Sequence, residues 1–307
     1  MLEELRARAL LPPGEPVVVL VSGGRDSVCL LDLAVRLAGP TAMRALHVNY
    51  GLRAGAPEDE ALCARLAAQL GVALEVLHAE RPEGAGNLQA WAREVRYTAA
   101  TGLADALGAA SIATGHTASD QAETVLYRLA SSPGRRALLG MREREGRLVR
   151  PLLGYTRARV TAYCEQRGLG WREDETNASE LYARGRVRTG LLPALAAVHP
   201  GAEANVVRTA ELLRDEADVL DELVGEILGG ADRIELKRLR AHPPALRRLV
   251  VQRLADAAAN GLAPRAARRT EEILALSGHP TAALDIGDGV RVVLERGVLR
   301  FTRDAGS

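Results

Sequence analysis

An apolar run that stops at a glycine turn constrains this chain more than any other stretch. Residues 17–21 are Val-Val-Val-Leu-Val, and Ser-Gly-Gly-Arg-Asp-Ser follows at 22–27, before an amphipathic stretch. Such an apolar run is typical of a strand buried on both faces of a parallel sheet. The two glycines allow a tight turn and let a ligand approach the backbone. Because the next helix begins with free N–H groups, the sequence predicts a phosphate-binding turn.

Two familiar nucleotide-binding loops do not fit this stretch. The P-loop needs a Lys after its last Gly, and the single Lys of the chain, Lys237, is far from any glycine-rich turn. The dinucleotide fingerprint needs three glycines after a strand, and Gly84 with Gly86 lacks the third. The alternative without a ligand is a strand-to-helix turn capped by Ser22 or Ser27.

Strand and helix patterns alternate up to about residue 168. Strands are expected at 16–21, 42–48, 72–78, 110–114 and 147–150, and helices at 26–38, 57–70, 87–107, 118–130 and 156–168. This alternation predicts an α/β fold with a doubly wound parallel sheet. Ligands of such sheets bind beyond the carboxyl ends of the strands, so the segments after the strands should line one crevice.

The second part of the chain has a different pattern. Helices are expected at 183–197, 201–229, 243–260 and 266–276, followed by short strands at 282–286, 290–295 and 298–302. We therefore predict two domains, a catalytic one at 1–198 and a smaller one at 199–307. The smaller domain should be mainly helical and should end in short β-strands.

Charge is balanced over the whole chain but not along it. There are 40 basic and 39 acidic residues, so the net charge gives no indication of nucleic acid. Residues 135–159 hold eight Arg against two Glu, and residues 233–253 hold six Arg and Lys237 against one Glu. These stretches predict surfaces that contact phosphates, with solvated helix faces as the alternative.

The cellular setting follows from residues that the sequence lacks. The three cysteines, Cys29, Cys63 and Cys164, form no C-x-x-C pair, which is typical of reduced thiols. No apolar run reaches about 18 residues, and the N-terminus carries acids and no signal-peptide core. The sequence therefore predicts a cytoplasmic protein without a membrane partner.

Polar residues gather at a second strand end, in the sequence at 115–124. His116 follows the strand expected at 110–114, and Asp120 and Glu123 lie on one face of the next helix, which Thr117 or Ser119 can cap. Acids at a helix start are also common partners of the helix dipole, which is the structural alternative. Further on, Arg184 and Arg188 share a helix face.

These motifs resemble a known family. The SGGRDS at 22–27 resembles the loop of the PP-loop (N-type) ATP pyrophosphatases. Within that superfamily the chain is similar to the tRNA(Ile)-lysidine synthetases, through HVNYGLR at 47–53, GHTASDQAET at 115–124, WREDETN at 171–177 and YARGRVR at 182–188. The chain departs from the family pattern at Asn49, Tyr50, Thr117, Ser119 and Gly185.

The resemblance implies a reaction in which ATP adenylates C2 of the wobble cytidine of the CAU-anticodon tRNA(Ile). The ε-amine of L-lysine then gives lysidine, AMP and pyrophosphate. ATP is expected at Ser22, Gly23, Gly24, Arg25, Asp26, Ser27, Asn49 and Arg53, and Mg²⁺ at Asp26 and Asp120. The catalytic residues are expected to be Asp26, His116, Asp120 and Arg188. The substrates are expected at Asp120, Glu123, Arg184 and Arg188. The smaller domain at 199–307 is expected to bind tRNA or another substrate.

Three rival functions remain open at this point. A PP-loop enzyme that thiolates tRNA would usually carry paired cysteines, which are absent here. An amidating ligase would usually bring a glutaminase domain. A non-catalytic nucleotide-binding protein is suggested by the changes at Asn49 and Ser119. The sequence also leaves open whether the protein is a homodimer.

Overall fold

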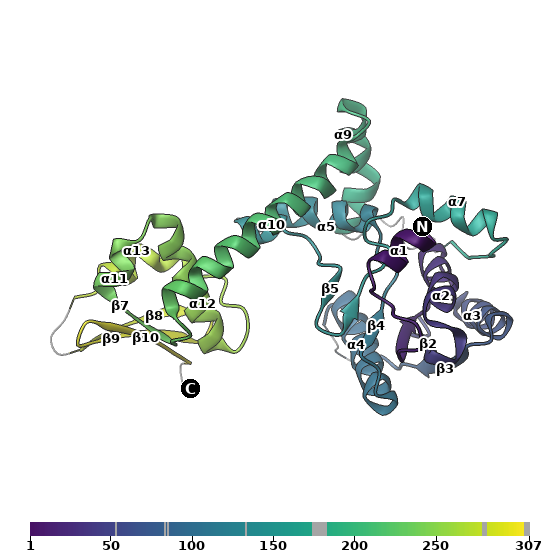
Figure 1. The fold of residues 1–307 in the computed structure, drawn as a ribbon, viewed down its shortest axis with the longest axis horizontal. Coiled ribbons are helices and arrows are strands. Elements are labelled where there is room, and N and C mark those ends of the chain that lie inside the picture. Colours follow the sequence, from purple (N-terminus) through teal and green to yellow (C-terminus); the bar gives the residue numbers. More distant parts are fainter. Residues whose placement is uncertain are drawn as a thin grey trace. The chain divides into compact units, whose positions relative to one another are not determined.

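The computed structural model of the protein describes residues 1–52, 54–82, 84, 86–132, 134–173, 183–277 and 281–303. The chain divides into two compact units, Met1–Glu211 and Leu212–Ser307 (Figure 1). Helix α10 (Ala202–Leu228) runs from the first unit into the second, so the division by contacts falls within a helix. The domain boundary after residue 198 stays a prediction.

The first unit contains a six-stranded sheet in the order β3-β2-β1-β4-β6-β5. Strands β1 (Val17–Leu20), β2 (Met43–Asn49), β3 (Ala73–His78), β4 (Ser111–Ala113) and β6 (Leu148–Val149) are parallel, and β5 (Arg144–Glu145) pairs antiparallel at one edge. The prediction of a doubly wound parallel sheet is therefore confirmed. The antiparallel edge strand was not predicted.

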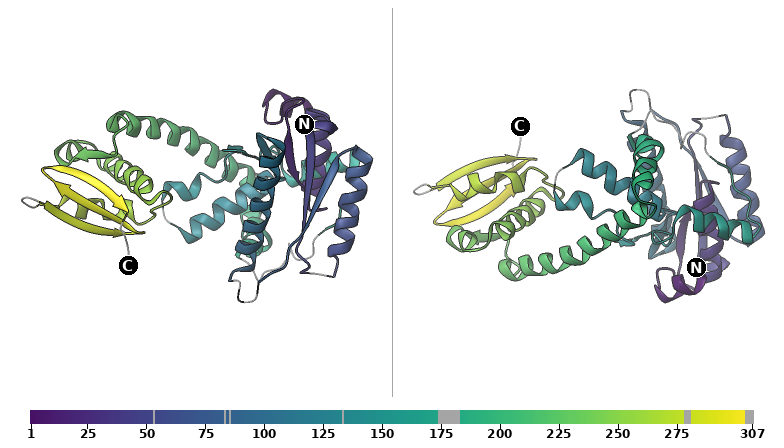
Figure 2. Two further views of the ribbon diagram at one scale, coloured as in Figure 1. Left: turned by 90° about the horizontal axis from the view of Figure 1, so that it is seen from below. Right: turned by 90° about the horizontal axis from the view of Figure 1, so that it is seen from above.

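Helices cover both faces of this sheet (Figure 2). Helices α1 (Leu2–Ala7), α2 (Arg25–Ala38), α3 (Ala56–Leu70) and α7 (Arg157–Gln166) share one core with Val17 and Val19. Helix α4 (Leu88–Leu107) packs on the other side with Val18 and Leu20. Successive residues of β1 thus enter opposite layers, which explains why the strand is apolar at every position.

The remaining helices of the first unit are α5 (Ala118–Ser131), α6 (Arg135–Leu138), α8 (Ala183–Arg186) and α9 (Leu192–Val198), with a 3₁₀ turn, η1 (Pro40–Ala42). The sequence predicts one helix over 183–197. In the structure a π-helical turn, η3 (Val187–Leu191), separates α8 from α9. Such turns often occur at functional sites, and this one carries Arg188.

The second unit packs helices against one face of an antiparallel sheet in the order β7-β10-β9-β8. Alternate residues of β9, such as Val290 and Val292, are buried, as expected for a sheet with one solvated face. Strand β7 was not predicted, and the helix expected at 266–276 is shorter. The elements are β7 (Arg233–Glu235), α11 (Leu236–Ala241), α12 (Pro244–Ala259), η4 (Ala266–Arg269), α13 (Thr270–Leu274), β8 (Thr281–Gly287), β9 (Val290–Glu295) and β10 (Val298–Arg303).

None of the helices in the described ranges combines the length and the apolar composition that a membrane span requires.

Candidate active site

The site lies where the direction of winding changes in the sheet. After β1 the chain builds outward through β2 and β3, and β4 then returns to the other side of β1. The loops after β1 and β4 are therefore neighbours, and such a switch point opens a crevice. A Cβ atom on Gly115 would stand 3.0 Å from the backbone carbonyl of Asp26 and 3.1 Å from the backbone nitrogen of Ser27. Only glycine lets the two loops approach this closely.

Hydroxyl groups hold the glycine loop in shape. Gly23 has a left-handed backbone with φ +80°, which favours glycine at this position. The Ser27 hydroxyl donates to the carbonyl of Gly24 at 2.8 Å and accepts from the backbone N–H of Ser22 at 3.1 Å. Helix α2 then begins at Arg25. The loop thus presents the start of a helix to the crevice, as an anion site requires.

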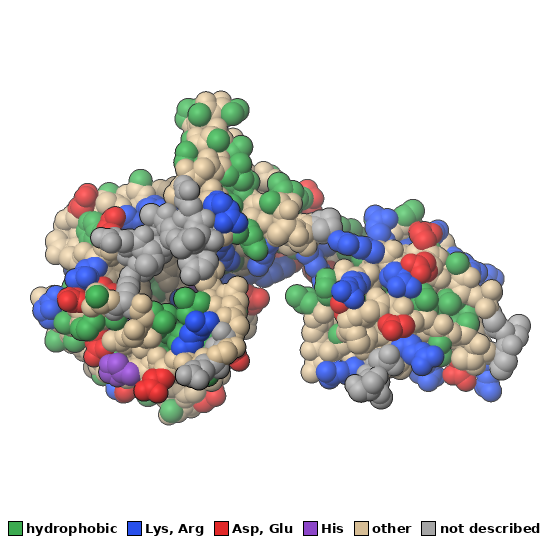
Figure 3. All heavy atoms as spheres, turned by 180° about the vertical axis from the view of Figure 1, so that it is seen from behind, with side chains coloured by type: hydrophobic (Ala, Val, Ile, Leu, Met, Phe, Trp, Pro, Cys, Tyr) green, Lys and Arg blue, Asp and Glu red, His purple; other side chains and the backbone are tan. Residues whose placement is uncertain are grey.

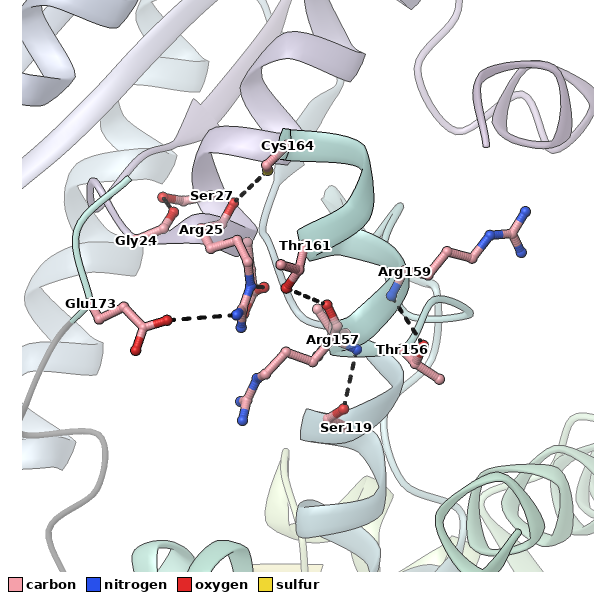
Figure 4. A network of polar contacts seen from close by, with 12 residues as sticks. Gly24, Arg25, Ser27, Ser119, Thr156, Arg157, Arg159, Thr161, Cys164 and Glu173 are labelled. Carbon is pink, nitrogen blue, oxygen red and sulfur yellow. Dashed lines mark hydrogen bonds and ion pairs between the residues drawn. The ribbon is translucent and has the colours of Figure 1, made fainter. Parts of the chain in front are cut away.

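The segment that follows α7 packs against this loop. The backbone N–H of Arg172 donates to the carbonyl of Gly23 at 3.0 Å, and the Arg172 side chain pairs with Asp59 at 2.8 Å. Figure 4 shows α7 beside the start of α2, with Arg25 reaching toward Glu173. Residues distant in sequence therefore support the glycine loop from the side.

Helix α5 begins with a capping box that includes the predicted acid. Both the backbone N–H and the hydroxyl of Thr117 donate to Oδ2 of Asp120, each at 2.8 Å. Thr117, not Ser119, is therefore the capping residue. The other Asp120 oxygen, Oδ1, lies 3.5 Å from the guanidinium of Arg188.

Arg188 is anchored by the second predicted acid of this helix. It donates from Nε to Oε1 of Glu123 at 2.5 Å and from Nη2 to Oε2 at 3.0 Å. This bidentate geometry is specific to arginine and fixes the direction of its side chain. Glu123 is buried, with 4% of its surface exposed, and Arg157 approaches the same carboxylate at 4.0 Å.

These loops enclose a cavity of about 420 Å³. Most predicted site residues line it, namely Ser22, Gly24, Arg25, Asp26, Ser27, His116, Asp120 and Arg188.

Burial and charge change the acidity of two groups in the cavity. Burial, together with the nearby charge of Asp120, raises the pKa of Asp26, although Arg25 and Arg157 oppose the shift. Burial also lowers the pKa of His116 to about 4. His116 is therefore neutral near pH 7, and its Nδ1 lies 2.8 Å from the hydroxyl of Thr114.

The residues present fit a magnesium ion that is completed by substrate phosphates. Among the described side chains, no cluster of three or more His, Cys, Asp or Glu could hold a metal alone. Mg²⁺ commonly uses only one or two carboxylates plus phosphate oxygens. Asp26 and Asp120 line one cavity, and each raises the local negative charge, which a cation would offset.

Four predicted residues do not line the cavity, namely Gly23, Asn49, Glu123 and Arg184, and a fifth, Arg53, cannot be placed. The side chain of Asn49 donates to Glu60 of α3 at 2.8 Å, away from the cavity. Arg184 is exposed and does not line the cavity. Arg53 lies outside the described residues, as does most of the WREDETN motif after residue 173.

Several lining residues were not singled out from the sequence. One signal was available, because Leu46 and Val48 alternate along β2, Tyr50 continues the alternation one residue past its end, and all three line the cavity. The alternation that puts Tyr50 inside therefore turns Asn49 outward. Five further lining residues were not predicted. Arg96, Thr114 and Arg157 lie outside the quoted motifs, whereas Trp171 and Arg172 lie within WREDETN but were not predicted as site residues.

The fold and the loop define the class of protein. A parallel sheet with a glycine-serine loop at its switch point is the arrangement of the PP-loop proteins, and a family model described as a PP-loop domain matches residues 3–195.

Curated relatives give the particular family. The chain is 37% identical over 302 residues to a tRNA(Ile)-lysidine synthase of Leifsonia xyli, covering 95% of this chain and 91% of the relative. It is 40% identical over 266 residues to the tRNA(Ile)-lysidine synthase of Thermus thermophilus, covering 83% of this chain but 51% of that relative. The chain belongs to the tRNA(Ile)-lysidine synthase family.

A solved structure supports the fold alone. The U34-tRNA thiolase of Methanococcus maripaludis, with its [4Fe-4S] cluster, superimposes with a TM-score of 0.58 at 19% identity. The superposition covers 69% of this chain and 78% of the thiolase.

Proposed function

We propose that this chain is a carbon–nitrogen ligase that forms lysidine at the wobble cytidine of the CAU-anticodon tRNA(Ile). ATP and L-lysine are the other substrates, and AMP and pyrophosphate are the products. The observation that carries the proposal is one cavity lined by the phosphate loop, Asp120 and Arg188. The relatives that match most of the chain bear the name of this enzyme. A cytoplasmic setting, where tRNA and ATP occur, is part of the proposal.

In the first step the C2 oxygen of cytosine attacks the α-phosphorus of ATP, and pyrophosphate leaves. The leaving group is strongly anionic, so it needs donors fixed in advance. The backbone of residues 22–27 and the start of α2 supply such donors. Arg25 and Arg157 extend beside this loop, where they can neutralise phosphate charge (Figure 4).

Asp26 and Asp120 are the proposed magnesium ligands. The ion would offset the charge of the pyrophosphate group. The raised pKa of Asp26 reflects burial beside a second carboxylate, which a bound cation would reverse.

In the second step the ε-amine of lysine attacks C2 and AMP leaves. A free lysine amine has a pKa of about 10.4, so only ~10⁻³ of it is deprotonated at pH 7. A proton acceptor is therefore required, and Asp120 is the proposed general base. His116, which is neutral, lies in the same cavity and is available to orient the reacting groups.

The pairing of Glu123 bears on its proposed role. A contact between Glu123 and the α-ammonium of lysine would have to share the carboxylate with Arg188, which already binds both oxygens. The geometry favours Glu123 as the residue that holds Arg188 in place. Arg188, held in this way at the cavity, is proposed to stabilise phosphate or adenylate charge.

The rival functions have less support. Thiolation needs sulfur or a cluster on accessible cysteines, and Cys29, Cys63 and Cys164 are all buried and unpaired by disulfides. A protein that only binds nucleotide would not need the paired Asp120, Glu123 and Arg188 beside the phosphate loop.

The proposal is tested with the full-length protein, tRNA(Ile) transcript, ATP and lysine. Mass analysis of the tRNA nucleosides should find lysidine, and AMP and pyrophosphate should appear in equal amounts. Omitting either tRNA or lysine should abolish lysidine. Production of ADP, or AMP release without any change of the tRNA nucleosides, would refute the proposal.

A further inference from the structure

One wall of the cavity carries an arginine that has no carboxylate partner among the described residues. Arg96 of α4 lines the cavity, and its Nε atom is buried without a hydrogen-bond partner. Across the described ranges no Asp or Glu forms an ion pair with it, whereas the lining residues Arg25, Arg172 and Arg188 each pair with a carboxylate. A half-buried guanidinium with a buried, unsatisfied Nε and no carboxylate partner in the described ranges is expected to meet an anionic ligand.

An aromatic surface adjoins this arginine. Tyr50 also lines the cavity, and its ring lies 5.7 Å from that of Trp91 in an edge-on arrangement. The Tyr50 hydroxyl donates to the carbonyl of Ala92 at 2.9 Å, which fixes the ring. Tyr50 and Arg96 line the same cavity. Burial raises the pKa of Tyr50, and the neighbouring Arg96 opposes this shift.

Nucleotides of single-stranded RNA are bound by surfaces of this kind. Bases stack on aromatic rings, and arginine pairs with the backbone phosphate. We propose that Tyr50, Trp91 and Arg96 bind the anticodon nucleotide that enters the cavity, with its base against Tyr50 and its phosphate at Arg96. The proposal rests on the proposed function and assigns residues to the RNA within it.

The adenosine of ATP is the competing occupant. Adenine carries no charge and would leave Arg96 unsatisfied, while the phosphates of ATP are accounted for by the loop at residues 22–27. Leu20, Leu46 and Val48 line the same cavity and offer adenine an apolar surface instead. The unsatisfied guanidinium therefore favours a further anionic group beside the Tyr50 ring, and a nucleotide of the RNA supplies both a phosphate and a base for the ring. The α-carboxylate of L-lysine is the other anion of the proposed reaction, and RNA binding measured without lysine distinguishes the two.

The test compares Arg96→Ala with a matched control on the same helix. Arg93 is exposed, its guanidinium lies 4.6 Å from the Tyr97 ring, and it does not line the cavity. Binding of a CAU anticodon stem-loop RNA is followed by fluorescence anisotropy at several salt concentrations. Arg96→Ala should weaken binding about 10-fold and lower the slope of log affinity against log salt by about one. Arg93→Ala should change neither, and both variants should keep ATP affinity within about twofold.

The aromatic contribution is tested at Tyr50. Tyr50→Phe keeps the ring and should bind the RNA nearly as the wild type does, whereas Tyr50→Ala should weaken binding about 10-fold. Equal melting temperatures of all four variants exclude unfolding as the cause. The proposal is overturned if Arg96→Ala loses ATP and retains RNA, or if Arg93→Ala loses RNA as strongly.

Failure of the site and failure of the function give different results. If the RNA binding depends on Arg96 but the wild type forms no lysidine, the proposed function is wrong and the RNA site stands. If the wild type forms lysidine and Arg96→Ala has unchanged RNA affinity and an unchanged KM for tRNA, the site is wrong and the function stands.

Discussion

The two carboxylate oxygens of Asp120 have different neighbours. One carboxylate oxygen closes the capping box of α5 with Thr117, and the other lies toward Arg188 and the cavity. An acid in a capping box is usually explained by helix stability alone. Because the same carboxylate lines the cavity, an isosteric amide can separate its structural task from its chemical one.

We predict that Asp120→Asn folds normally but forms lysidine about 10²–10⁴-fold more slowly, because an amide can still accept from Thr117 but cannot take a proton. Single-turnover formation of lysidine, measured by nucleoside mass analysis, checks this. Asp105→Asn removes a surface partner of Arg147 outside the cavity and serves as the control. A rate within twofold of the wild type for Asp120→Asn would show that Asp120 is not the base.

His116 should make stability depend on pH. Burial lowers the pKa of His116 to about 4, whereas an unfolded histidine titrates near 6.5. As the pH falls between these values, the unfolded chain binds a proton that the folded protein does not, so the free energy of unfolding decreases. The decrease should be on the order of 2 kcal/mol.

Urea unfolding at pH 7 and pH 5, with His116→Asn as the comparison, measures this contribution. The asparagine cannot titrate, so the variant should lose less stability over this interval. If both proteins lost the same free energy of unfolding between pH 7 and pH 5, the pKa of His116 would not be lowered by burial.

At the scale of elements, the close approach of two loops makes the site. The loop after β1 and the loop after β4 touch through Gly115, and α5 begins three residues later. The position of the cavity therefore depends on close packing of two backbone segments at Gly115, where a side chain would push the two loops apart.

We predict that Gly115→Ala lowers ATP affinity about 10-fold and the free energy of unfolding by about 1–3 kcal/mol, because its Cβ would meet Asp26 and Ser27. Calorimetric titration with ATP and urea unfolding measure the two effects. Gly102→Ala in α4 is the control, since no atom lies within 4 Å of its added Cβ. That change should stabilise the protein by about 0.5–1 kcal/mol. Unchanged ATP affinity in Gly115→Ala would show that nucleotide binding does not depend on the contact between the two loops.

At the scale of the whole molecule, local charge matters more than net charge. Figure 3 shows Lys and Arg side chains spread over the visible face of the second unit, with Asp and Glu among them. The structure distinguishes hydrogen-bonded from exposed basic side chains in the stretch at 233–253. Arg240 and Arg247 donate to backbone carbonyls, whereas Lys237, Arg238 and Arg248 are exposed.

The exposed residues of this stretch are the ones that we expect to contact tRNA. Replacing Lys237, Arg238 and Arg248 together by Ala should weaken tRNA binding and lower its salt slope by about three, one for each phosphate contact. Filter binding across salt concentrations measures the slope, and Arg65→Ala on the exposed surface of α3 is the control. A slope equal to that of the wild type would assign these residues to a solvated face.

The sequence by itself determined what depends on neighbours along the chain. The apolar run of β1, the glycine loop and the capping residues of α5 are local patterns, and each appears in the structure as the element or turn that was predicted. Tertiary structure alone decided which side chains meet. Asn49 and Tyr50 are adjacent in sequence, yet pairing and burial of β2 turn one toward α3 and the other into the cavity. Arg96 joins the same cavity from a helix that no motif had marked, because packing of α4 on the sheet is a contact between distant segments.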